Sequence, residues 1–114
     1  MRTLILMPDW NAILFWRDAE SRDAVDESTL PISATLKHEL SSFYVWFSEL
    51  FFRDSEQPAS LTDRRLLDAR GIELWRRLRT ELGSTHRVLF YSHEFNHEFE
   101  SPDDFTAMRG QTYA

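Results

Sequence analysis

One stretch of this sequence has the residue types and spacing of a zinc hydrolase site. His93, Glu94 and His97 form an H-E-x-x-H string. On a helix the two histidines would share one face and bind one Zn²⁺, while the glutamate would take a proton from the metal-bound water. The chemistry therefore depends on whether this string is helical.

The pattern around the string favours a strand. Between Val88 and Phe99 a strand would place on one side the odd-numbered residues, which are leucine or have rings: Leu89, Tyr91, His93, Phe95, His97 and Phe99. The other side becomes polar from Ser92 onward, and this alternation is typical of a strand. His93 and His97 would then lie about 13 Å apart, too far for both to bind one ion at about 2.0 to 2.1 Å. A third ligand would have to come from positions at no diagnostic spacing: His86, Glu100, Asp103 or Asp104. We expect no metal and no cofactor, and keep a zinc-dependent hydrolase as an alternative function.

Other chemistry has less support. The chain has no cysteine, which excludes a disulfide framework, a thiol nucleophile and a thiolate metal site and fits a reducing compartment. An apolar patch near the N-terminus is cut short by Pro8 and Asp9 before it reaches the length of a signal-peptide core. No long uninterrupted apolar run is present, so we expect a cytoplasmic protein without a membrane span.

The net charge of −6 is unevenly distributed. Residues 61–87 contain seven Arg and four acidic residues, a net +3, so the rest of the chain carries six basic and fifteen acidic residues, a net −9. Direct nucleic-acid binding is disfavoured because it needs a positive surface, whereas a basic protein partner fits. The acidic residues form a first cluster of Asp18, Glu20, Asp23, Asp26 and Glu27 and a second cluster of Glu94, Glu98, Glu100, Asp103 and Asp104.

Two helices are predicted to position these groups. Apolar residues recur at steps of three and four within 33–53 and again within 61–82. Ser33 and Ser60 can cap the two N-termini, and Gly83 supplies the expected stop of the second helix. The short connection between them predicts an antiparallel hairpin.

Strands are predicted near 3–7 and 87–95, and 12–16 is either a third strand or an apolar loop. Residues 3–7 are apolar enough for a strand buried on both faces, and we expect them to pair with 87–95. The fold class is therefore α+β, with a two- or three-stranded sheet covered by the helical hairpin. We expect one domain over 1–114, in which 101–114 is a mobile tail.

The first predicted helix has more aromatic surface than a hairpin and a small sheet would hide. Trp46 and Phe52 lie off its main apolar stripe, so we expect them to face a partner. With Phe51 they give another alternative, a structural or regulatory subunit that forms a homodimer. Gly71 lies on the apolar side of the second helix, which predicts close approach to a large ring such as Phe43 or Phe47.

The spacing of several residues resembles a group of short bacterial proteins of unknown function. These residues are Leu30-Pro31-Ile32-Ser33, Leu36, Leu40, Gly71, Leu74, Leu78 and Glu81-Leu82-Gly83. The resemblance covers about residues 3–91. Members of this kind occur beside polymorphic toxins and include suspected immunity proteins, which implies a protein that binds a toxin and carries no catalytic residues.

Our main hypothesis from the sequence is therefore a non-enzymatic, immunity-type inhibitor. Its partner would be a cognate toxin or another basic protein, contacted by the two acidic clusters together with Trp46 and Phe52.

Overall fold

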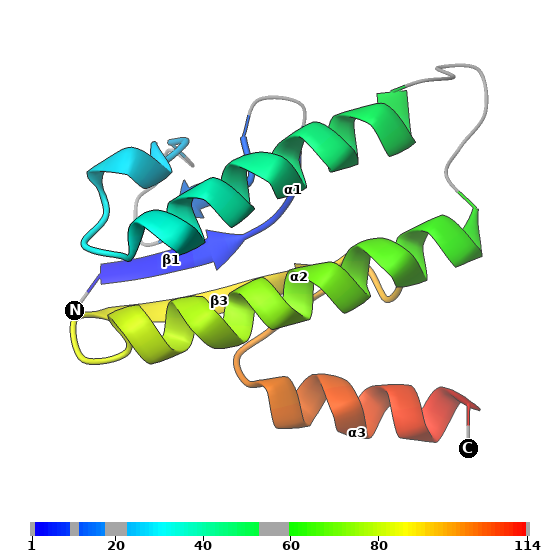
Figure 1. The fold of residues 1–114 in the computed structure, drawn as a ribbon. Helices are drawn as coiled ribbons and strands as arrows, with labels where there is room; N and C mark the ends of the chain where they lie inside the picture. The colour runs from blue at the N-terminus through cyan, green and yellow to red at the C-terminus, as the bar shows by residue number, and fades with distance from the viewer. Residues whose placement is uncertain (1, 10–11, 18–22, 53–59, 114) are drawn as a thin grey trace.

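A computed structural model describes residues 2–9, 12–17, 23–52 and 60–113, with the backbone alone for Phe52 and residues 111–113. Figure 1 shows α1 and α2 as an antiparallel pair in front of the strands. The predicted α+β class is confirmed, with four strands in place of two or three. The elements in chain order are β1 (Arg2–Leu6), β2 (Leu14–Trp16), the 3₁₀ helix η1 (Glu27–Thr29), α1 (Ala34–Phe52), α2 (Leu61–Leu82), β3 (His86–Ser92), β4 (His97–Phe99) and α3 (Pro102–Tyr113).

The helical hairpin forms where its sequence predicts it. Ser33 Oγ accepts the backbone N–H of Leu36 at 3.1 Å, and Ser60 Oγ accepts that of Asp63 at 3.0 Å, so each serine satisfies a free donor in the first turn. Gly83 is the residue at which α2 ends. None of the helices in the described part of the chain is long and apolar enough to cross a membrane.

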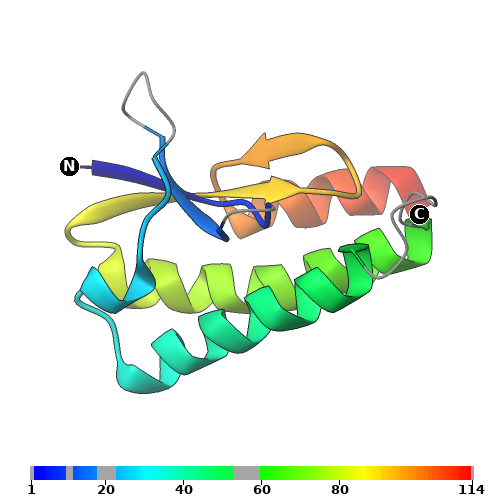
Figure 2. The same ribbon diagram turned by 90° about the horizontal axis from the view of Figure 1, so that it is seen from above.

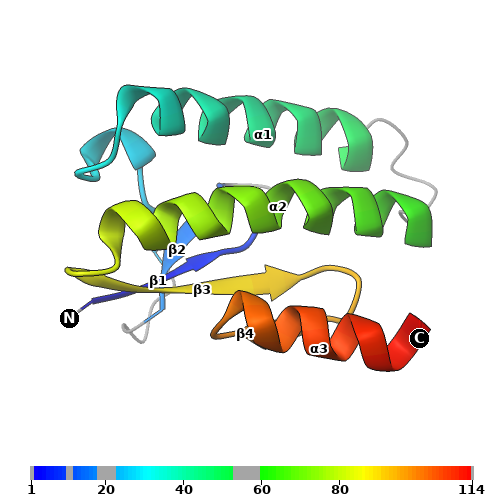
Figure 3. The same cartoon turned by 60° about the horizontal axis from the view of Figure 1, so that its bottom comes forward.

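The four strands are arranged in the order β2-β1-β3-β4. β1 pairs with β3 in parallel, as the connection through α1 and α2 permits, and the pairs at both edges are antiparallel. Residues 12–16 thus contribute a strand, Leu14–Trp16. Figures 2 and 3 show the helical hairpin on one side of the sheet.

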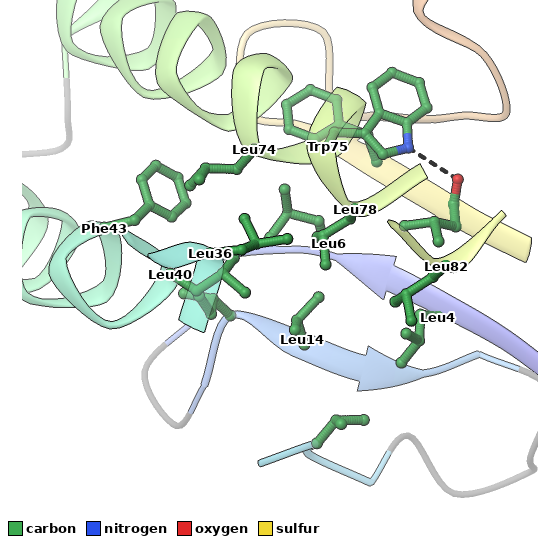
Figure 4. Close-up of a cluster of buried hydrophobic side chains, with 14 of the residues drawn as sticks. Leu4, Leu6, Leu14, Leu36, Leu40, Phe43, Leu74, Trp75, Leu78 and Leu82 are labelled. Carbon is green, nitrogen blue, oxygen red and sulfur yellow. Dashed lines mark hydrogen bonds between the residues drawn. The ribbon is translucent and has the colours of Figure 1, made fainter. Parts of the chain in front are cut away.

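The core lies between this hairpin and the sheet, where Leu side chains from β1, β2, α1 and α2 meet (Figure 4). Trp75 is fully buried, and its indole Nε1–H donates to the carbonyl of Val88 at 2.8 Å. Gly71 permits the closest contact in this layer. A Cβ at Gly71 would lie 2.7 Å from a ring carbon of Phe90 and 3.7 Å from one of Phe43, so the predicted close approach exists and Phe90 of β3 is the nearest ring.

The strand predicted over 87–95 needs correction. β3 ends at Ser92, the chain turns through 93–96, and β4 returns antiparallel with Phe99 opposite Phe90. Asn96 has a φ of 51°, a left-handed conformation that Asn tolerates in turns. The alternation in the sequence continues through the turn, so it gave no sign of a chain reversal. Because Phe99 pairs directly with Phe90, both face the core, whereas one continuous strand would place them on opposite faces.

Helix α3 was not predicted from the sequence. Phe105 is buried, with its ring centroid 6.0 Å from that of Phe90 and 5.3 Å from that of Phe99. Ser101 followed by Pro102 is a helix-start signal, and the Oγ of Ser101 accepts the N–H of Asp104 at 3.3 Å. The helix was missed because one buried aromatic gives no periodicity. The single-domain organisation and the mobility of the tail stay predictions.

Candidate functional site

The H-E-x-x-H string lies in the β3–β4 hairpin, where Asp68 of α2 organises the turn. This carboxylate is 1% exposed and accepts Ser92 Oγ–H at 2.5 Å, His93 N–H at 3.0 Å and Glu94 N–H at 3.3 Å. Ser92 Oγ in turn accepts the N–H of Phe95 at 3.0 Å. Burial raises the pKa of Asp68, and the three hydrogen bonds oppose that rise. Asp68 thus anchors the hairpin to α2.

Glu94 is held inside the protein rather than presented as a base. Its side chain is 1% exposed, 3.0 Å from Nη2 of Arg109 and 3.6 Å from Nε of Arg65. Because α2 and α3 each supply one arginine, this carboxylate ties three elements together. The carboxylate of Glu94 is thus engaged by two arginines of the protein itself, and its role in partner binding stays a prediction.

The two histidines lie at opposite ends of the turn in different surroundings. His93 lies among aromatic rings, with centroid distances of 5.2 Å to Tyr91, 5.8 Å to Phe51 and 6.0 Å to Phe47, and burial lowers its pKa. His97 is exposed and packs edge-on against Phe99. Within the described residues, no group of three His, Asp or Glu side chains is close enough to hold a metal ion. The residues of the string do not fit a zinc site.

Much of the second acidic cluster faces arginines of the chain itself. Glu98 accepts from Arg17 Nε at 3.2 Å, and Glu100 pairs with Arg87. Asp103 lines a surface hollow together with Arg76 and Arg79. Asp104 lines another hollow with His97, Glu98 and Glu100. This cluster presents less uncompensated negative charge than its sequence suggests.

The first acidic cluster has a different setting. Asp18 and Glu20 lie outside the described residues, whereas Asp23 and Asp26 are exposed and Glu27 is half-buried. The carboxylate of Asp26 accepts the Ser28 N–H at 2.9 Å. This hydrogen bond is the main reason that the pKa of Asp26 is lowered, so Asp26 is an anion at neutral pH.

Asp26 and Glu27 line a hollow between α1 and the segment 24–27, which we call the α1 hollow. Its volume is about 370 Å³. Most of the lining is apolar, and it comes from three stretches that are distant in the sequence: Ala12 and Ile13, Ala24 to Glu27, and Ser41 and Tyr44 of α1. Two carboxylates thus stand beside an apolar floor.

A second hollow lies along α1 and includes Trp46. Its volume is about 430 Å³, and Ser41 lines both this hollow and the α1 hollow. Trp46 is half-buried, since the guanidinium of Arg70 lies 4.2 Å above its ring. Val45 beside it is 55% exposed. The side chain of Phe52 lies outside the described residues.

The structure thus brings Asp26, Glu27 and Trp46 to two hollows along one helix and places the second acidic cluster elsewhere. The sequence analysis missed Ile13, Ser41 and Tyr44. Tyr44 carried a signal, because it follows Phe43 on the edge of the apolar stripe of α1. No spacing rule relates Ile13 to α1, since the two are brought together by the fold alone.

The model of the family described as Serratia CdiI immunity protein-like matches residues 2–93. This range includes β1 to β3, α1, α2 and all residues that line the α1 hollow. No curated protein matches the chain.

Proposed function

Because the chain belongs to the Serratia CdiI immunity protein-like family, we propose that it is an immunity-type inhibitor that binds one cognate toxin in the cytoplasm. The family match is the observation that carries this proposal, and it agrees with the resemblance seen in the sequence. An inhibitor of this kind blocks its target by occupying it. It needs complementary shape and charge but no catalytic group.

The surface along α1 is the proposed toxin-binding face. Exposed Asp26 and half-buried Glu27 line one hollow, with exposed Asp23 nearby in the sequence, and Trp46 lines the other. Charge of this sign suits a basic partner. A toxin that acts on nucleic acid has a basic active site, and carboxylates can take the place of phosphates there.

The two alternative functions have less support from the contacts. A zinc hydrolase would need Glu94 free to act on water, but Arg65 and Arg109 hold it in the interior. A homodimer through surplus aromatics would need those rings at the surface. Phe51 instead packs against Phe47, with ring centroids 5.0 Å apart.

Growth rescue tests the function directly. The toxin is first identified by affinity purification of the chain from its native cells. The chain is then produced in cells together with that toxin domain, which is also used for binding measurements with the purified proteins. We expect the chain to restore growth and to form a stable complex. Continued toxicity at full expression of the folded chain would overturn the assignment.

A matched pair of triple variants tests the surface. Asp23→Lys, Asp26→Lys and Glu27→Lys together change the charge by the same amount as Glu100→Lys, Asp103→Lys and Asp104→Lys. We expect at least about tenfold weaker toxin binding from the first set and less than about threefold from the second, since only the first changes the α1 hollow. An equal loss from both sets would show that net charge, rather than this face, governs binding.

A further inference from the structure

We propose that the α1 hollow is a socket for one arginine side chain of the toxin. This inference rests on the proposed function and names the group that the proposed face recognises. Three properties of the hollow support it: its floor, its charge and its size.

The floor suits the aliphatic part of a long side chain. Ile13 and Val25 are 2% and 5% exposed, so they form a fixed apolar base, and Ala12 and Ala24 add further apolar atoms. Tyr44 contributes an aromatic surface from α1. The methylene groups of Arg or Lys gain from burial against such a floor while the charged end stays near polar groups.

The charge of the hollow selects a cation. Asp26 and Glu27 both line it, and the pKa of Asp26 is lowered by the hydrogen bonds from Ser28 and by Lys37. Lys37 itself donates from Nζ to the backbone carbonyl of Ser28 at 3.0 Å. The Ser28 N–H occupies one carboxylate oxygen of Asp26, and a carboxylate has about four lone-pair sites, so it can accept further bonds. An acidic partner group would be repelled here.

Arginine fits this combination better than lysine or an uncharged residue. A guanidinium presents several N–H donors in a plane and can bind a carboxylate through two parallel bonds. It also packs favourably on aromatic rings such as that of Tyr44. An apolar partner group would cover two carboxylates without replacing their water, which is costly. Arg is enriched among the residues that dominate binding energy at protein interfaces.

The size of the hollow admits a long side chain. Its volume is about 370 Å³, at the low end of the range for sites that enclose small ligands, about 300 to 1,000 Å³. A helix of the toxin, about 10 Å across, would instead have to lie across its mouth.

The socket can be tested without the toxin. The probes are N-acetyl-arginine amide and N-acetyl-citrulline amide, which have nearly the same shape but differ in charge. We expect the arginine probe, at millimolar concentration, to shift the backbone amide NMR signals of Ala24 to Glu27, Ser41 and Tyr44, and the citrulline probe to give less than a third of these shifts. Equal shifts from both probes, shifts confined to other residues or no shifts at all would overturn the proposal.

Two double variants provide the control. Asp26→Asn with Glu27→Gln should remove most of the arginine-induced shifts, whereas Asp103→Asn with Asp104→Asn should retain them. If Asp26→Asn with Glu27→Gln retained the arginine-induced shifts, these two carboxylates would not be what binds the probe. The lysine analogue is a further probe, and binding as strong as that of the arginine probe would show that charge alone is selected.

The toxin assay separates failure of this inference from failure of the proposed function. If the unmodified chain rescues growth and the Asp26→Asn, Glu27→Gln variant binds the toxin equally well, the inhibitor function stands and the socket is wrong. If the unmodified chain fails to rescue growth, the proposed function is wrong, whatever the NMR experiment shows.

Discussion

The β3–β4 hairpin and the α1 hollow contain the same kinds of side chains in opposite circumstances. Glu94 in the hairpin is 1% exposed and held by arginines of α2 and α3. Asp26 and Glu27 border a surface hollow, where exposed Asp26 accepts the Ser28 N–H and Lys37 contributes to its lowered pKa. Acidic character alone therefore does not mark a binding residue. What distinguishes the two regions is whether the carboxylate is buried among the protein's own arginines.

The largest effect is expected from Asp68→Ala. Alanine would leave three donors near the hairpin without their acceptor, the Ser92 hydroxyl and the N–H groups of His93 and Glu94. We expect the free energy of unfolding to fall by about 3 to 4 kcal/mol in urea denaturation, given roughly 1 to 3 kcal/mol for each buried unsatisfied group. The exposed Asp103→Ala is the control. A loss below about 1 kcal/mol would mean that the hairpin does not depend on α2.

Gly71→Leu tests the layer between α2 and β3 that supports both regions. A Cβ at Gly71 already lies 2.7 Å from Phe90, so a larger side chain must displace that ring. We expect a net loss of about 2 kcal/mol, since overpacking typically costs up to about 3 kcal/mol and the gain in helix propensity offsets about 1 kcal/mol of it. Gly110→Ala in α3 meets nothing within 4 Å and should be neutral or stabilising. A thermal melt of Gly71→Leu equal to wild type would refute this packing.

Glu94→Gln tests how much the buried carboxylate of the β3–β4 hairpin contributes to stability. The uncharged side chain would keep its shape but lose the charge that Arg65 and Arg109 share. Both arginines are more than one-third exposed, so water compensates part of the loss, and we expect destabilisation by about 1 to 2 kcal/mol. Glu100→Gln, an exposed partner of Arg87, should change stability by less than about 0.5 kcal/mol. Equal effects from both substitutions would erase the distinction between buried and exposed pairs.

The pH dependence of stability should reveal His93. Burial lowers its pKa below the ordinary 6.5, so the unfolded chain takes up a proton more readily than the folded protein. The contribution of His93 to the free energy of unfolding is therefore fully present above pH 6.5 and decreases as the pH falls toward the lowered pKa. Asp68, whose pKa is raised from 3.8, changes the free energy of unfolding with pH in the opposite direction. Its contribution cancels in the comparison because every variant retains Asp68.

Urea denaturation between pH 5 and pH 7.5 measures this contribution as the difference between wild type and His93→Phe. The difference should shift in favour of the phenylalanine variant as the pH falls. His97→Phe, at an exposed position of the same hairpin, is the control for introducing a phenylalanine here. Parallel curves for wild type and His93→Phe would contradict the buried, neutral state of His93.

The smallest stability effect is expected at the α1 hollow. Glu27→Gln removes one charge beside the apolar floor, and because no intramolecular ion pair is broken within the described residues, the free energy of unfolding should stay within about 0.5 kcal/mol of wild type. Toxin binding should weaken by about fivefold or more in the same variant. A stability loss like that of Glu94→Gln would place Glu27 with the structural carboxylates.

The sequence anticipated much of the fold because helices and caps are local features. Ser33, Ser60 and Gly83 set the ends of α1 and α2 through groups only a few residues away, and the predicted ranges agree with Ala34–Phe52 and Leu61–Leu82. The hairpin turn at 93–96 was missed because Asp68, which holds it, lies more than twenty residues earlier in the chain. Helix α3 was missed because what anchors it is the packing of Phe105 against Phe90 and Phe99 of the β3–β4 hairpin, which the local sequence does not reveal.

The fold class, the helical hairpin, the excess of negative charge and the likeness to immunity proteins could all be inferred from the amino-acid sequence. Periodicity, capping residues and composition carry that information because they act over short distances or over the whole chain. The folded structure was needed to learn which carboxylates are exposed and what the H-E-x-x-H string does. Those outcomes depend on contacts between residues far apart in the chain, such as Glu94 with Arg65 and Arg109, and Ile13 with Glu27 and Tyr44 around one hollow.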